Sequence, residues 1–216
     1  MPKAILIFGP TCAGKSTIGQ ILKKEFVIPY YSFGDLKRLE IDNNTKLGKN
    51  IAAKITLQEA IDPEQGMQLI MNRYQNEEYI SICGYPISWP EMSNFQEIFT
   101  VTTIINLKAS PRLIRRRYFR RGVCPKCKYP GTLGSTCPIH YIALVKRDDV
   151  TEEELKIRLK LYKNRIYPFF SDLSKSGVFN IIEYSAGKKQ AGQIIAKIKD
   201  VIGEHNAKTK TNHTSH

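Results

Sequence analysis

A glycine-rich segment near the start of the chain has the spacing of a phosphate-binding loop. Residues 9–17, GPTCAGKST, match the pattern G-x-x-x-x-G-K-[ST]. Glycines let the backbone approach a bound group, and the amide N–H groups of such a loop point toward phosphate oxygens. Lys15 can reach the β- and γ-phosphates of a nucleotide, and the Ser16 hydroxyl suits Mg²⁺. The residues expected to cradle the phosphates are Gly9, Pro10, Thr11, Cys12, Ala13, Gly14, Lys15, Ser16 and Thr17.

Three of the five cysteines gather with a histidine in a second motif. The ligand pairs are Cys124-x₂-Cys127 and Cys137-x₂-His140, a spacing that suits tetrahedral Zn²⁺. All four coordination positions would be filled by protein, so the metal would be structural. A polar insertion of this kind has little core of its own, and a metal would supply that stability. The alternative is a set of unrelated surface cysteines with a chance histidine.

Arginines gather in two later segments of the chain. Six fall between Arg112 and Arg121, and among them Arg116 and Arg120 are one helical turn apart. Arg147 and Arg158 flank the acidic run 152–154. Guanidinium groups stabilise the charge that spreads over a phosphoryl group in transfer, provided that water is excluded. The alternative for Arg147 and Arg158 is salt bridging to the acidic run.

The elements that must position these residues alternate between strands and helices, which predicts an α/β fold. We expect a parallel five-stranded sheet flanked by helices, with a small zinc-bound insertion. The residues Thr151 and Glu154 have the spacing of a capping box before a long helix. Expected strands cover 3–8, 27–33, 79–83, 99–107 and 178–184, and expected helices 16–26, 35–41, 48–55, 62–74, 188–202 and segments starting at Pro111 and Thr151.

Composition narrows the class of protein. The chain has 216 residues, 42% of them hydrophobic, and a net charge of +13, which attracts nucleotides or other polyanions. No apolar run reaches the roughly 20 residues that a membrane span needs, so no membrane partner is expected. The five cysteines are odd in number and unevenly distributed along the chain, which argues against a disulfide scaffold and for a reducing compartment. We expect a cytoplasmic monomer. Nucleic acid is a less favoured partner of the basic surface.

Taken together, these motifs resemble the adenylate kinase branch of the nucleoside monophosphate kinases, in order and up to about residue 203. The segment SFGDLKR (32–38), the arginines RRYFRR (116–121) and the stretch 147–162 with its RLKLY ending are the specific matches beyond the loop. The cysteine module resembles the zinc-bearing lid of bacterial-type members. The resemblance implies a core at 1–121 and 146–203, an acceptor-binding helical segment at about 33–62 and a lid at 122–145; we expect the basic tail 204–216 to be disordered.

The resemblance also implies roles for individual residues. ATP with Mg²⁺ would bind the loop, where Arg116 covers the base and Arg120 grips the phosphates. Transfer to a nucleoside monophosphate, AMP by default, would be direct and in line. The implied catalytic residues are Lys15, Arg120, Arg147 and Arg158; the implied acceptor-binding residues are Phe33, Arg38, Gly84, Tyr85, Glu91, Arg147 and Arg158; the implied metal ligands are Cys124, Cys127, Cys137 and His140 for zinc and Ser16 for magnesium.

The acceptor side departs from the family pattern. Cys83 stands where the family has an aspartate that holds a water on Mg²⁺, and Ile87 replaces an arginine for the acceptor phosphate. Glu91 replaces a glutamine that reads adenine. Because a carboxylate only accepts hydrogen bonds, Glu91 would suit a base edge rich in N–H donors, such as that of guanine. Two alternatives stay open: a kinase for another small phosphate acceptor, and a low-turnover nucleotide-binding or sensor protein.

Overall fold

A parallel sheet organises the molecule. The computed structural model describes residues 1–57, 59–127, 129–147, 149–186 and 195–200. Five parallel strands follow the order β2-β3-β1-β4-β8, and they span β1 (Lys3–Phe8), β2 (Tyr30–Ser32), β3 (Tyr79–Cys83), β4 (Thr100–Lys108) and β8 (Asn180–Ser185). The central strand β1 is apolar along nearly its whole length because helices cover both faces of the sheet. The predicted α/β class and five-stranded parallel sheet are therefore confirmed.

Each face of the sheet has its own apolar layer. On one face, Ile5 and Ile7 of β1 pack against Ile18 and Leu22 of α1 (Lys15–Phe26). On the other face, alternate residues of β1 pack against a larger set of helices. These helices are α2 (Phe33–Asp42), α3 (Lys46–Thr56), α4 (Pro63–Met71), α5 (Trp89–Gln96) and α8 (Tyr167–Lys175).

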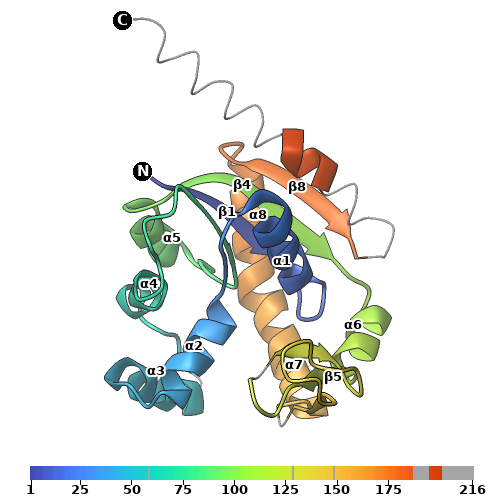
Figure 1. Cartoon of the computed structure of the whole chain (residues 1–216). Coiled ribbons are helices and arrows are strands. Elements are labelled where there is room, and N and C mark those ends of the chain that lie inside the picture. Colours follow the sequence, from blue (N-terminus) through green and yellow to red (C-terminus); the bar gives the residue numbers. More distant parts are fainter. Residues whose placement is uncertain (58, 128, 148, 187–194, 201–216) are drawn as a thin grey trace, which may run out of the picture.

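One long helical run connects the sheet to the opposite end of the molecule. The segments α7 (Glu152–Leu161), η1 (Tyr162–Ile166) and α8 follow one another without a break, and η1 is a π-helical turn. The run begins as predicted, with the Thr151 side chain accepting the Glu154 N–H at 3.1 Å. Figure 1 shows the run reaching from the sheet, where α8 packs, to α7 at the lower end, which lies between the pair α2 and α3 on one side and β5 on the other.

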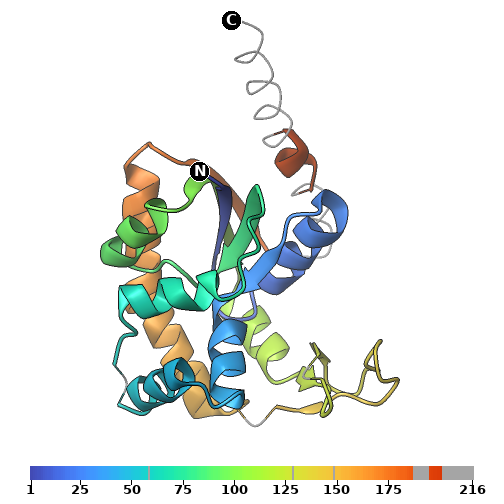
Figure 2. The ribbon, with the colours of Figure 1, turned by 60° about the vertical axis from the view of Figure 1, so that its left-hand side comes forward.

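The cysteine segment forms a separate small sheet. The strands β5 (Arg121–Val123), β6 (Pro130–Thr132) and β7 (Val145–Lys146) are antiparallel in the order β6-β5-β7. This sheet projects from the end of α6 (Pro111–Tyr118), which packs on α7 through Ile114 and Tyr118. In Figure 2 it stands apart from α2 and α3 at the same end of the molecule.

Some sequence predictions fall outside this description. The helix α5 was not predicted. Only residues 195–200 of the predicted last helix lie among the described residues, and they are helical. The predicted disordered tail 204–216 lies outside the described residues. None of the described helices has the length and apolar character needed to cross a membrane.

Candidate active site

The loop between β1 and α1 lies at the carboxyl edge of the parallel sheet. Gly9 has φ +135°, and a Cβ there would lie 2.5 Å from the carbonyl oxygen of Leu107. Gly14 caps α1 with φ 107°, also in the left-handed region. These two positions require glycine, so the loop stays close to β4 and leaves the N-terminus of α1 open to an anion.

Lys15 folds back over the loop. Its Nζ donates to the carbonyl oxygens of Gly9 and Pro10, both at 2.7 Å. Burial lowers the pKa of Lys15, and the charges of Arg121 and Arg158 act in the same direction. Cys83 and Cys12 oppose this lowering of the pKa. A bound phosphate would favour the charged ammonium group.

Two arginines of the α6 segment approach the loop, and they are not the expected pair. The Nη1 of Arg117 donates to the Cys12 carbonyl oxygen at 3.1 Å. Burial lowers the pKa of Arg121, and the nearby charge of Arg147 is the next cause. Arg116 and Arg120 are exposed, and neither side chain is hydrogen-bonded to another described residue. The structure therefore brings Arg117 and Arg121, rather than Arg116 and Arg120, to the phosphate loop.

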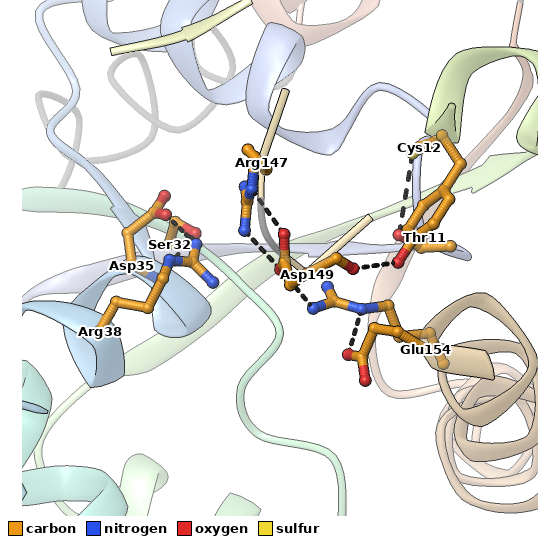
Figure 3. Close-up of polar contacts among 10 residues, drawn as sticks. Thr11, Cys12, Ser32, Asp35, Arg38, Arg147, Asp149 and Glu154 are labelled. Atoms are coloured by element: carbon orange, nitrogen blue, oxygen red, sulfur yellow. Dashed lines mark hydrogen bonds and ion pairs between the residues drawn. The ribbon is translucent and has the colours of Figure 1, made fainter. Parts of the chain in front are cut away.

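Asp149 joins the two arginines of the lid-exit segment. It accepts from Arg147 Nε at 2.8 Å and Nη2 at 2.6 Å, and from Arg158 Nη2 at 2.9 Å. Arg158 also donates to Glu154 at 2.7 Å, so the salt bridging considered from the sequence does occur. Although burial opposes it, the bond from Arg147 holds the pKa of Asp149 below its usual value. Figure 3 shows Arg147 and Asp149 between Arg38 on one side and the loop residues Thr11 and Cys12 on the other.

The expected acceptor side is built on an aromatic stack. The rings of Phe33 and Tyr85 are buried and stacked, with centroids 4.7 Å apart. Gly84 has φ +81°, and a Cβ there would touch the Phe33 side chain at 3.6 Å. Arg38, on the same helix as Phe33, pairs with Asp35 (Figure 3). The structure thus brings Phe33, Gly84 and Tyr85 together, and their role in binding an acceptor stays a prediction.

Glu91 is engaged by the protein itself. Its Oε2 accepts the Ile87 N–H at 2.6 Å, and its Oε1 accepts from Arg165 at 3.3 Å. The carboxylate is buried at the start of α5. Each carboxylate oxygen of Glu91 therefore already accepts a hydrogen bond from the protein, which counts against the hypothesis that Glu91 reads the acceptor base.

Cys83 ends β3 beside the phosphate loop. Its Sγ lies 2.8 Å from the Tyr30 hydroxyl, which donates to Ser16 Oγ at 3.3 Å. Burial raises the pKa of the Cys83 thiol, although Lys15 opposes the rise. A neutral thiol and phenol thus stand next to the serine that was predicted to hold magnesium.

The predicted zinc ligands come together in the small sheet. The ligand atoms of Cys124, Cys127, Cys137 and His140 all lie within 4.8 Å of one another. The His140 Nδ1 is 3.7 Å from Cys124 Sγ, and Cys127 Sγ is 3.7 Å from Cys137 Sγ. Two thiolates on a tetrahedral Zn²⁺, each at about 2.3 Å, are separated by roughly 3.8 Å. The arrangement is compatible with a tetrahedral metal site.

Five residues of this region were not predicted from the sequence: Tyr30, Arg117, Arg121, Asp149 and Arg165. Arg117 follows the buried Ile114 by three residues on α6, but Arg121 lies in β5, beyond the end of the helix, so helical spacing does not predict its direction. Asp149 stands two residues after Arg147, but carboxylates near arginines are too common to single out. Nothing in the sequence pairs Tyr30 with Cys83 or Arg165 with Glu91, because these contacts depend on the fold.

A glycine loop at the end of β1, with lysine and arginine side chains converging on it, defines a P-loop phosphotransferase. The sequence model of the adenylate kinase family matches residues 7–178. Adenylate kinase of Borrelia recurrentis is 27% identical over 209 residues, covering 90% of this chain and 97% of that protein. Adenylate kinase of Clostridium perfringens is 25% identical over 214 residues, covering 92% and 98%. The chain therefore belongs to the adenylate kinase family and is an ATP-dependent phosphotransferase, and the family supports nucleoside monophosphate kinase activity.

Proposed function

We propose that this protein transfers the γ-phosphate of ATP directly to a nucleoside monophosphate, with AMP as the default acceptor. The observation that carries the proposal is the convergence of basic side chains on the phosphate loop: Lys15 Nζ donates to the carbonyl oxygens of Gly9 and Pro10 at 2.7 Å, and Arg117 Nη1 donates to the Cys12 carbonyl oxygen at 3.1 Å. The charges of Arg121 and Arg158 act to lower the pKa of Lys15, and a phosphoryl group in transfer is the anion that such a group of cations suits. The relatives' printed names support the same reaction.

In this proposal the loop residues 9–17 and Lys15 bind the ATP phosphates, and Arg147 and Arg158 stabilise the charge on the transferred group. The two donor-side roles move from Arg116 and Arg120 to Arg117 and Arg121. The reason for this change is position: Arg117 donates a hydrogen bond to the loop, and Arg121 is close enough to Arg147 for that charge to lower its pKa. Asp149 holds Arg147 and Arg158 ready until phosphate oxygens replace its carboxylate.

The donor atoms near the loop fit magnesium in part. The exposed Ser16 hydroxyl is a hard oxygen, as Mg²⁺ prefers, whereas a protonated thiol such as Cys83 is a poor ligand. We therefore propose that Ser16 and the ATP phosphates hold the ion. When bound, Mg²⁺ would neutralise part of the charge on the β- and γ-phosphates.

The lid, residues 122–145, is proposed to hold one structural Zn²⁺ through Cys124, Cys127, Cys137 and His140. Cysteine and histidine are the donors that zinc prefers in closed four-ligand sites. The buried core beside them is small, consisting of the two buried cysteines, Leu144 and the half-buried Ile142, so a metal would supply much of the stability. The rest of the proposed domain organisation is a nucleotide-binding core, residues 1–121 and 146–203, which includes an acceptor-binding helical segment at about 33–62.

A panel of AMP, GMP, CMP and UMP with ATP and Mg²⁺ tests the proposal. Formation of ADP together with a matching nucleoside diphosphate supports it and identifies the acceptor. ATP binding by a folded protein without transfer to any of the four would overturn it, and would favour the low-turnover reading. Best turnover with AMP would remove the idea that Glu91 selects a donor-rich base.

A further inference from the structure

Arg165 places a guanidinium group next to the proposed acceptor site. It belongs to the π-helical turn η1, seven residues after Arg158, or roughly 10 Å along the helical run. Its Nη2 donates to Glu91 Oε1 at 3.3 Å, and its side chain is 35% exposed. An arginine carries five N–H donors, so the bond to Glu91 leaves most of them available. The Glu91 contact holds the guanidinium in place without saturating it.

Glu91 is connected to the aromatic stack as well. The Tyr85 hydroxyl lies 3.5 Å from the Glu91 carbonyl oxygen, and the Tyr85 ring stacks on Phe33. The Nζ of Lys37 lies over the Phe33 ring, 5.3 Å from its centroid. Arg165, Glu91, Tyr85, Phe33 and Lys37 therefore form one continuous wall.

This wall carries more positive than negative charge. Burial lowers the pKa of Lys37, and the charges of Arg38 and Arg158 act in the same direction. Arg165 adds to this effect, while Glu91 opposes it. Among the described residues Lys37 is in no ion pair, whereas Arg38 and Arg158 each have a carboxylate. Within the wall, the single buried carboxylate of Glu91 stands against two cations, Arg165 and Lys37, and this excess of positive charge suits an anion.

We propose that Arg165, oriented by Glu91 and assisted by Lys37, binds the phosphate group of the acceptor monophosphate. This inference rests on the proposed function and deepens it, because it names the residues that hold the acceptor. Ile87 presents no charge to the site, and the cation is supplied instead from η1. Glu91 is then a positioning residue for Arg165, and its two oxygens are occupied by the protein rather than by the acceptor base.

The alternative is that Arg165 only neutralises the buried Glu91. Binding of the four nucleoside monophosphates and of their phosphate-free nucleosides, measured by calorimetry on the full chain without ATP, separates the two. We expect Arg165→Gln to weaken the monophosphate that binds best by about 10- to 100-fold. Nucleoside binding should change by less than about twofold. The control Lys160→Gln removes a charge from an exposed site on the same helical run and should change neither.

The double variant Glu91→Gln with Arg165→Gln guards against misfolding, because it removes the carboxylate that the single variant leaves unpaired. Monophosphate binding that stays weak in the double variant supports a direct phosphate contact. Binding restored to the wild-type level, equal losses for nucleoside and monophosphate, or no binding of any monophosphate by the wild-type chain would each overturn the inference.

Transfer is assayed separately on the same variants. If the wild-type chain transfers no phosphate but Arg165→Gln still weakens monophosphate binding, the proposed function is refuted and the inference stands. Normal transfer and normal binding in Arg165→Gln would refute the inference alone.

Discussion

The Tyr30 hydroxyl lies 2.8 Å from the Cys83 sulfur and 3.3 Å from Ser16 Oγ. These contacts join β2, the end of β3 and the first turn of α1. Burial raises the pKa of the Cys83 thiol, so it is protonated at neutral pH. A hydrogen-bonded neutral pair therefore occupies the strand end where related kinases are expected to have a carboxylate.

Replacing this thiol by a carboxylate should not harm the enzyme. We expect Cys83→Asp to leave kcat equal or to raise it by up to about tenfold, and to lower the Mg²⁺ concentration required, because outer contacts to a metal are typically worth about 10- to 100-fold. Magnesium titrations of the rate measure both effects. Cys83→Ser is the matched neutral control and should resemble the wild type. A collapse of kcat in folded Cys83→Asp would mean that the thiol has a role of its own.

The two neighbouring arginines at the start of β5 give a paired test. Arg121→Gln should lower kcat by about 10³-fold, because an arginine that stabilises transferring phosphate can be worth that much. Arg120→Gln should change kcat by less than about twofold, because its side chain is exposed and has no described partner. Steady-state rates with saturating ATP and acceptor decide between them. The reverse ranking would restore Arg120 to the site and contradict the assignment.

This pair also shows how far sequence reasoning reaches. The loop 9–17, the sheet and the four zinc-type ligands were predicted because each depends on local pattern. Spacing of four residues describes both 116/120 and 117/121, and only the packing of Ile114 and Tyr118 on α7 decides which pair faces the loop. The helix α5 was missed because Trp89–Gln96 spans only about two turns, and its two apolar core residues, Met92 and Phe95, are too few to show a helical period. The contact of Arg165 with Glu91 joins residues 74 positions apart, which no local pattern encodes.

Metal removal should affect the lid first. We expect about one Zn²⁺ per chain in purified protein, and Cys127→Ser should lower both the metal content and the melting temperature, because a tetrahedral site loses one of its four ligands. Metal analysis and thermal unfolding with and without a chelator measure this. Cys12→Ser, outside the cluster, is the matched control and should retain its metal. A folded wild-type sample with metal content near zero would contradict the zinc proposal.

Asp149 gives a prediction for pH. The charges around it hold its pKa below the usual 3.8, so its stabilising effect is present above about pH 4 and is lost as the pH falls through the lower, folded-state pKa. Asp149→Asn should reduce the free energy of unfolding by about 1 kcal/mol at pH 7. The difference from the wild type should shrink below about pH 4. Denaturant unfolding of both proteins at pH 7 and below about pH 4 measures the difference in the free energy of unfolding. A difference that grows on acidification would contradict the ion-pair account.

The most direct test follows the transferred phosphate itself. ATP labelled at the γ-phosphate is incubated with the protein and the best monophosphate of the panel, and the product is analysed for label. We predict that the label appears at the β-position of the new nucleoside diphosphate at the rate at which ADP forms, and that Lys15→Met, while folded, abolishes it. Release of the label as free phosphate, or no turnover by a wild-type protein that binds ATP, would contradict direct transfer between two nucleotides.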